Sequence, residues 1–236
     1  MTSVGEGMSM ATSDSRFSIA LFKEPISALT HFLGFLAALG GLGFLVWNSD
    51  GSVAKSTSMW VYGLSLSLLF GASATYHFVD AGERGNAWLR RADHVAIFAL
   101  IAGTYAPMLV HLLDGSWRIA MLVTVGVLAS VGTVFKLLWV DAPTWLSTSS
   151  YLLLGWVVLI PAPIILPQLS AWAGLWLVLG GLIYSVGALV YARQWPDPWP
   201  DKMGHHEVWH LFVLGGAAAH FAFVVCLLDL PTPPFG

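Results

Sequence analysis

The stretch His206-Glu-Val-Trp-His210 opens the last long apolar segment of the chain, and its two histidines are the point from which the rest can be understood. Four residues of α-helix turn by about 400°, so the two imidazoles share one helix face roughly 6 Å apart. That separation suits two ligands of one zinc ion. The same letters match H-E-x-x-H, the metalloprotease motif in which the glutamate is the general base. The stretch therefore predicts a metal site, and leaves open whether Glu207 belongs to it.

The composition is that of a membrane protein. Of the 236 residues, 57% are hydrophobic and only 10% are charged, and the mean hydropathy is +0.74. A soluble domain carries about 25% charged residues. The net charge of −3 gives no reason to expect a nucleic-acid partner. The single cysteine, Cys226, excludes an intramolecular disulfide.

Seven stretches are long and apolar enough to cross a bilayer, which takes about 20 residues. They are 26–47, 58–79, 92–113, 117–140, 145–166, 171–191 and 206–228. Pro107 and Pro161-Ala-Pro163 are predicted to kink their helices. We therefore expect an all-α integral membrane protein, a seven-transmembrane-helix bundle formed by one domain, 25–229. A short disordered cytoplasmic tail, 1–24, without a cleaved signal peptide, precedes it, and a C-terminal tail, 230–236, follows.

The basic residues predict the orientation, because they gather on the cytoplasmic side of membrane proteins. With the N-terminus cytoplasmic and the C-terminus outside, eight of them lie inside: Arg16, Lys23, Arg84, Arg90, Arg91, Lys136, Arg193 and Lys202. Only Lys55 and Arg118 then lie outside. We expect a multi-pass protein of the inner membrane in this orientation.

Polar residues inside the predicted spans cluster near the cytoplasmic leaflet, and such residues are functional candidates because they are costly in lipid. Ser73 and His77 are an i, i+4 pair in the second stretch, and Asp93 lies in the third. Together with His206 and His210, His77 would supply three imidazoles, which with a water suffice for a catalytic zinc. Asp93 could orient or deprotonate that water, and Ser73 could hydrogen-bond it or a developing oxyanion.

Other interpretations of the histidines remain. A histidine inside a membrane span often hydrogen-bonds a neighbouring helix. Bis-histidine haem ligation needs facing pairs on two helices, and only His77 and His31 could face the last span, which disfavours it. His220 shares the helix face of His206, but it lies about 15 Å beyond His210 along the axis. We therefore expect His220 to pack or hydrogen-bond deeper in the bundle.

The motifs taken in order resemble the bacterial hemolysin III family, which is related to the progestin and adipoQ receptors, including the adiponectin receptors, and more distantly to alkaline ceramidases. The motifs are Glu24…His31, Ser73-Ala-Thr-Tyr-His77, Asp93-His-Val-Ala-Ile-Phe-Ala-Leu-Ile-Ala-Gly-Thr-Tyr-Ala-Pro107 and His206-Glu-Val-Trp-His210-Leu-Phe-Val…His220. The resemblance implies seven helices with the N-terminus inside, zinc on His77, His206 and His210, and Ser73 and Asp93 in the same site. One position departs from the family pattern, and another is variable in the family. Ser27 stands where the family often has Asn, and Glu207 occupies a variable position.

Three functions are compatible with these patterns. The favoured one is a zinc-dependent hydrolase of a lipid amide or ester, such as a ceramide-like molecule, at the cytoplasmic leaflet. The second is a non-enzymatic membrane sensor or a pore-forming, cytolytic protein with a structural zinc. The third is an intramembrane metalloprotease with Glu207 as its base and Asp93 as the third ligand. A membrane lipid is the expected substrate or ligand in the first.

Overall fold

The computed structural model describes residues 23–49, 53–199 and 203–230. Within these residues the regular structure is helical, apart from isolated bridge positions such as the pair Trp199 and Met203. The expected disordered tail lies outside the described residues except for its last two positions. The expected C-terminal tail lies outside them except for its first.

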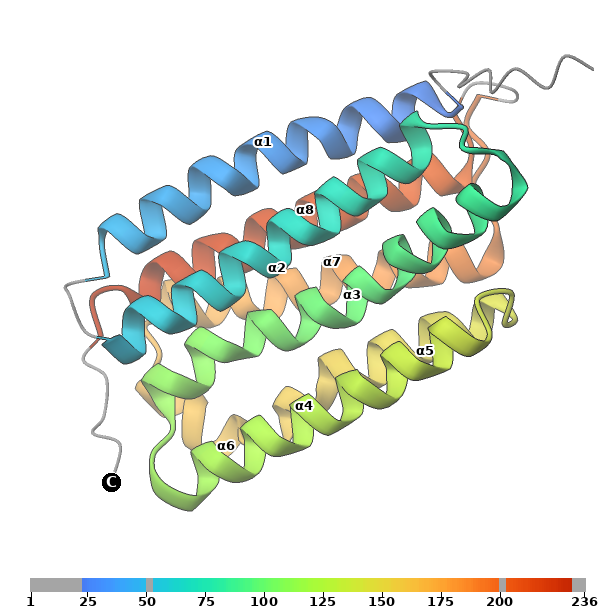
Figure 1. The fold of residues 1–236 in the computed structure, drawn as a ribbon. Coiled ribbons are helices and arrows are strands. Elements are labelled where there is room, and N and C mark those ends of the chain that lie inside the picture. The colour runs from blue at the N-terminus through green and yellow to red at the C-terminus, as the bar shows by residue number, and fades with distance from the viewer. Residues whose placement is uncertain (1–22, 50–52, 200–202, 231–236) are drawn as a thin grey trace, which may run out of the picture.

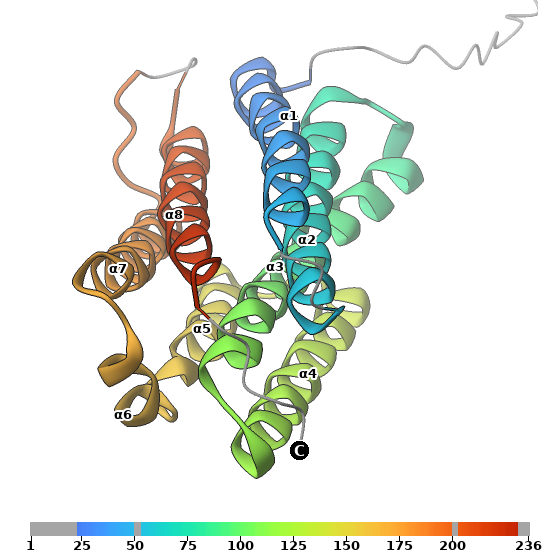
Figure 2. The ribbon, with the colours of Figure 1, turned by 90° about the vertical axis from the view of Figure 1, so that its left-hand side faces the viewer.

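The helices follow the predicted stretches in order. They are α1 (Pro25–Trp47), α2 (Val53–Phe78), α3 (Gly82–Leu112), α4 (Gly115–Leu138), α5 (Thr144–Gly155), the 3-10 turn η1 (Trp156–Leu159), α6 (Ala162–Ile165), η2 (Leu166–Gln168), α7 (Ala171–Arg193) and α8 (His205–Leu227). The long helices run side by side as an antiparallel bundle (Figure 1). In the turned view α3 lies inside the bundle, where it packs against α2, α4, α5 and α8 (Figure 2).

Among the described residues, five helices are long and apolar enough to cross a membrane, namely α1, α3, α4, α7 and α8. The segment from Thr144 to Gln168 adds a sixth if its two halves, bent by 44°, form one span. Large apolar side chains remain exposed on the outer faces of these helices, such as Leu29 at 58%, Val131 at 61% and Val178 at 50%. An apolar surface of this extent on closely packed long helices is the surface of a multi-pass membrane protein.

Two helices differ most in extent from the predicted stretches, and each of these differences has a physical reason. α3 begins at Gly82 rather than near residue 92, because charged residues such as Arg90 favour helix although an apolar criterion passes over them. The fifth stretch is broken at Pro161 and Pro163, where the missing N–H groups interrupt the helix ladder. The predicted kink is confirmed there, whereas α3 continues past Pro107 to Leu112.

Close contacts of glycines fix the position of α8 between α1 and α7. A Cβ atom on Gly41 of α1 would lie 2.7 Å from the Phe221 ring of α8. A Cβ on Gly180 of α7 would lie 2.3 Å from the His220 ring, and His220 Nε2 lies 3.3 Å from the Leu177 carbonyl oxygen. These positions need glycine because the helices approach so closely. The packing role expected for His220 is confirmed, and the register of α8 that carries the other two histidines is set by these contacts.

Candidate metal centre

Three histidines meet where α2 ends and α8 begins. His77 lies in the last turn of α2, and His206 and His210 lie on one face of the first turns of α8. One nitrogen from each ring can be chosen so that all three lie within 4.8 Å of one another. The ring centroids are 5.0 Å apart for His77 and His206, and 4.7 Å apart for each of the other two pairs. The fold thus brings together the three residues that the sequence singled out as ligands.

The nitrogen atoms of this group fit a metal ion. The Nε2 atoms of His77 and His206 are 3.4 Å apart, and two nitrogens bound at about 2.0–2.1 Å to a tetrahedral zinc lie about 3.4 Å apart. Nδ1 of His210 is buried and has no hydrogen-bond partner in the described part of the chain. A buried nitrogen without a partner is unfavourable unless something else binds it. The buried histidine group could therefore hold a metal ion.

Glu24, the residue just before α1, orients one of these rings. Its Oε2 atom accepts a hydrogen bond from Nδ1 of His77 at 2.8 Å, and its backbone N–H donates to the His77 carbonyl at 3.0 Å. The hydrogen bond from His77 lowers the pKa of the Glu24 carboxyl, so the group is ionised at neutral pH. With the proton on Nδ1, Nε2 of His77 presents its lone pair to the site. A carboxylate that accepts from the other ring nitrogen commonly fixes the tautomer and the orientation of a metal-ligating histidine in this way.

We expect Glu24→Gln to weaken metal binding at the histidine group about 10- to 100-fold, the usual effect of losing such an orienting carboxylate. The amide is neutral and holds the protonated Nδ1 less strongly. Competition with a chromophoric chelator measures the affinity. Glu83→Gln, which removes an exposed acid from the first turn of α3, is the matched control and should leave it unchanged. Equal affinities of Glu24→Gln and wild type would refute the role of Glu24.

His31 of α1 packs directly on the group. Its ring stacks on that of His210 with centroids 3.8 Å apart and planes 18° apart, and the Phe70 ring meets it edge-on at 5.1 Å. It is 3% exposed, and neither ring nitrogen has a hydrogen-bond partner within the described residues. The stack leaves no room for a porphyrin between His31 and His210. This contact therefore argues against haem ligation by these histidines. It also means that His31 holds the His210 ring in place by packing against it.

Glu207 is engaged in helix packing. Its Oε2 atom accepts a hydrogen bond from the backbone N–H of Gly204 at 2.8 Å, which caps the start of α8. Its Oε1 atom accepts from the Ser27 hydroxyl of α1 at 3.2 Å. Glu207 thereby joins α8 to α1, and Ser27, whose role the resemblance left open, is its partner.

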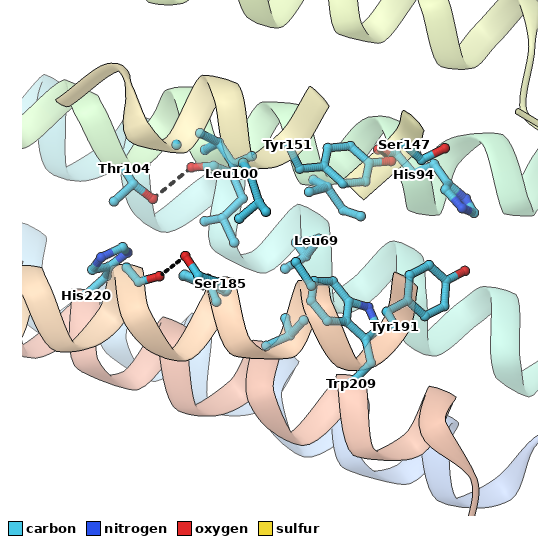
Figure 3. Close-up of a pocket in the computed structure, with 18 of the residues that line it drawn as sticks. Leu69, His94, Leu100, Thr104, Ser147, Tyr151, Ser185, Tyr191, Trp209 and His220 are labelled. Atoms are coloured by element: carbon cyan, nitrogen blue, oxygen red, sulfur yellow. Dashed lines mark hydrogen bonds between the residues drawn. The ribbon is translucent and has the colours of Figure 1, made fainter. Parts of the chain in front are cut away.

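A cavity of about 690 Å³ opens from the histidine group into the bundle. Both His206 and Phe223 of α8 line it, so it extends about 25 Å along that helix at 1.5 Å per residue. Figure 3 shows its walls, with Tyr191 at one end and His220 at the other. Between them the lining is mostly apolar, including Leu69 and other aliphatic side chains. Its size is that of a ligand-binding pocket.

Ser73 and Asp93 line the same cavity as the three histidines. Ser73 is buried, at 2% exposure, and Asp93 is half-buried on α3. Neither side chain makes a hydrogen bond to another residue that the structure describes, so both have capacity to bind a water or a ligand in the cavity. The structure thus gathers all five residues proposed from the sequence around one space.

The sequence did not reveal three features of this site: the bond from Glu24 to His77, the stacking of His31 and the pair of Ser27 with Glu207. Glu24 and His31 already stood in the quoted motifs, which was the available signal that they matter. Their partners lie on other helices, 53 residues away in the case of His77. Helix periodicity relates residues within one helix only, so it cannot predict contacts between residues so far apart in the sequence.

Comparison with known proteins places these features in a family. The sequence pattern described as "Haemolysin-III related" matches residues 19–221. The "Hemolysin-3 homolog" of Bacillus subtilis (strain 168) is 37% identical over 205 residues, covering 86% of this chain and 93% of that protein. The human "Monocyte to macrophage differentiation factor" is 27% identical over 219 residues, covering 89% and 87%. The "Heptahelical transmembrane protein 1" of Arabidopsis thaliana is 26% identical over 243 residues, covering 92% and 73%. The resemblance inferred from the motifs is confirmed.

Proposed function

The chain belongs to the Haemolysin-III related family, and we propose that it is a zinc-dependent hydrolase of a lipid amide or ester at the cytoplasmic leaflet of the inner membrane. One observation carries the proposal. The three histidines stand at one end of a long, largely apolar cavity that Asp93 and Ser73 also line. A site that could hold a metal, an acid and a hydroxyl beside a space for an acyl chain has the parts that such a reaction needs.

We take α2 as the seventh span. Its 26 residues make a helix about 39 Å long, enough for the hydrocarbon core. It is less apolar than the others because of its serines, but Ser65 and Ser67 donate their hydroxyls to carbonyls of the same helix, which lowers their cost in an apolar setting. The name of the heptahelical relative agrees with this count.

The N-terminus is proposed to be cytoplasmic. The starts of α1, α3, α5 and α8 and the ends of α2, α4 and α7 lie at one end of the bundle, and so does the histidine group. The basic residues described at this end are Lys23, Arg84, Arg90, Arg91, Lys136 and Arg193, against Lys55 and Arg118 at the other. This asymmetry favours the cytoplasm for the end that carries the site.

Zinc is the metal proposed, because three neutral imidazoles with a position left for water are a common catalytic zinc set. When bound there, it would supply a Lewis acid that activates water and polarises an acyl carbonyl. His77, held by Glu24, and His206 and His210, held by α8, would bind it. The burial of His77 and His210 would keep these two ligands in place, while the half-buried His206 borders the cavity from which water and substrate would enter.

The remaining residues take their roles from their positions in the cavity. The Asp93 carboxylate would accept the proton of the attacking water and pass it to the leaving amine or alkoxide. The Ser73 hydroxyl would donate a hydrogen bond to the oxygen that gains charge at the acyl carbon. One water is consumed, the acyl–N or acyl–O bond breaks, and a fatty acid and an amine or alcohol are released.

The experiment that tests the proposal uses purified, zinc-loaded protein in detergent with a panel of N-acyl sphingoid bases, acyl glycerols and phospholipids. Released fatty acid is quantified by mass spectrometry. We expect release from at least one class, and none after zinc is removed. Stoichiometric zinc with no hydrolysis across the whole panel would count against a hydrolase.

The second candidate is a membrane sensor or a pore-forming, cytolytic protein in which zinc is structural. The observation in its favour is that the metal site joins the end of α2 to the start of α8, while Glu24 adds the start of α1. A metal there would brace three helices whether or not it took part in catalysis. The hydrolase and the structural-zinc hypotheses make different predictions for Asp93. A structural zinc needs no acid beside it, so function would survive Asp93→Asn and be lost with His210→Ala.

A metalloprotease based on the H-E-x-x-H motif is disfavoured by the contacts of Glu207. We expect Glu207→Gln to change activity by less than about twofold, because the glutamine oxygen can still accept from the Gly204 N–H while its NH2 donates to the Ser27 hydroxyl. The change is then mainly a helix-cap substitution worth about 1 kcal/mol or less. The hydrolysis assay above measures this. Near-complete loss of activity, as expected when a general base is removed, would show that Glu207 is a catalytic residue and not only a helix cap.

A further inference from the structure

A second polar group lines the cavity on the wall formed by α3, α4 and α5. Lys136 lies in the last turn of α4, Ser147 in the first turn of α5, and His94 follows Asp93 on α3. Figure 3 shows His94, Ser147 and Tyr151 close together at one end of the cavity. The hydrolytic roles proposed above use none of these residues except Asp93.

Lys136 is a buried cation that pairs with no carboxylate in the part of the chain that the structure describes. It is 1% exposed, and its Nζ donates to the Ser147 hydroxyl at 2.7 Å and to the Val140 carbonyl at 3.1 Å, with the Phe135 ring 5.6 Å away. An ammonium has three N–H donors, so one has no acceptor within the described residues. No carboxylate of the described chain forms an ion pair with it. A charge buried in this way is unfavourable unless a partner supplies the opposite charge.

The neighbouring charges do not supply that partner. Asp141, which follows α4, pairs with Arg90 at 2.7 Å and is 74% exposed. Arg90 is itself a second cation on the cavity wall, and its carbonyl accepts from Nδ1 of His94 at 2.8 Å. Asp93 pairs with neither cation in the described residues, and adjacent helix residues such as Asp93 and His94 point about 100° apart. Among the described residues, Lys136 is therefore the cation on this wall that no carboxylate pairs with, although the Asp93 carboxylate lines the same cavity.

We propose that Lys136, with Ser147 and Arg90 beside it, binds the anionic headgroup of the lipid that enters the cavity. A phosphate or carboxylate oxygen would accept the remaining N–H of Lys136 and supply the missing charge, and such charge-assisted hydrogen bonds are strong. The preferred lipid then has an acidic headgroup rather than the neutral one of a ceramide-like molecule. The inference rests on the proposed function only in that the cavity takes a lipid.

The test measures binding to the full-length, zinc-loaded protein and needs no turnover. Two lipids with the same chain are compared, an alkyl-ether lysophosphatidic acid and the matching alkylglycerol, neither of which has an acyl bond to hydrolyse. We expect wild type to bind the phosphate lipid at least about tenfold more tightly, which is about 1.4 kcal/mol. Lys136→Met should bring the two affinities close together without weakening the alkylglycerol. Lys136→Arg should keep the preference.

Arg91→Met is the matched control, because Arg91 lies at the same end of the bundle but bonds to the carbonyls of Leu137 and Ala87 and does not line the cavity. It should keep the full preference. If Lys136→Met does not fold, as judged by zinc content and melting temperature, Lys136→Gln replaces it, since glutamine removes the charge but keeps a polar N–H donor on this side chain.

The measured affinities distinguish a lipid headgroup site from a structural role of Lys136 and from a site for free anions. Equal binding of both lipids by wild type overturns the headgroup site and leaves the hydrolase untouched. A preference that survives Lys136→Met and Lys136→Gln also overturns it, and makes Lys136 a structural link of α4 to α5. Inorganic phosphate that binds wild type as tightly as the phosphate lipid does would show a free-anion site instead of a headgroup site. Absence of binding by either lipid would refute the lipid cavity itself.

Discussion

Asp93→Asn is expected to lower the turnover number of lipid hydrolysis by about 10²- to 10⁴-fold, the contribution of a positioned general base, while zinc content stays at the wild-type level. The amide has nearly the shape of the carboxylate but cannot accept the proton of the attacking water. Since Asp93 makes no hydrogen bond to another described side chain, its replacement should not disturb packing. Fatty-acid release from the best substrate of the panel measures the loss.

The control for this substitution is Glu83→Gln, which neutralises an exposed acid on the same helix and should retain full activity. A fall in activity that comes with a loss of zinc would mean that Asp93 acts on the metal site as a whole. Full activity of Asp93→Asn would refute the catalytic role and favour a structural zinc.

Removing zinc is expected to destabilise the bundle as well as to stop hydrolysis. A ligand present at about 1,000 times its Kd stabilises the folded state by about 4 kcal/mol, and for a chain of this size each kcal/mol shifts the melting temperature by about 2–4 °C. Chelation should therefore lower the melting temperature by roughly 8–16 °C, because the metal no longer joins α2 to α8. Differential scanning fluorimetry in detergent measures the shift, and added zinc should reverse it.

His210→Ala gives the control for chelation. This variant lacks one of the three ligands, so the chelator should change its melting temperature little. A wild-type melting temperature that does not respond to chelator would show that the site contributes nothing to stability. A chelator response that persists in His210→Ala would place the metal elsewhere.

Much of the fold could be predicted because lipid restricts the choices. Long apolar stretches in a bilayer must be helices, since their backbone groups have no other partners. The composition and the apolar runs therefore predicted the helices in order. The start of α3 at Gly82 could not be predicted in this way, because hydropathy marks the embedded part of a helix and says nothing of its polar extension. α2 is the span that hydropathy supports least, because its serines lower its hydropathy below that of the other long helices, although it packs within the bundle and the stretch 58–79 is predicted to span.

The site could be predicted in its ligands but not in its supports. His206 and His210 are four residues apart, so helix geometry alone puts them on one face. His77 could be added because depth in the membrane limits which residues can meet. Glu24, His31 and the pair of Ser27 with Glu207 depend on how helices rotate and pack, which spacing does not encode. Lys136 appeared in the sequence only as a cytoplasmic charge, and its burial in the cavity wall became visible with the fold.

We propose that His77, His206 and His210 hold one zinc ion, and metal analysis of the purified protein measures this directly. Zinc is quantified by inductively coupled plasma mass spectrometry for wild type, His77→Ala and His210→Ala, each purified without added metal and normalised to amino-acid analysis. We predict about one zinc per wild-type chain, as expected for a three-histidine site, and almost none in either variant. Wild type without zinc, or full zinc content in both variants, would refute zinc binding by these three histidines.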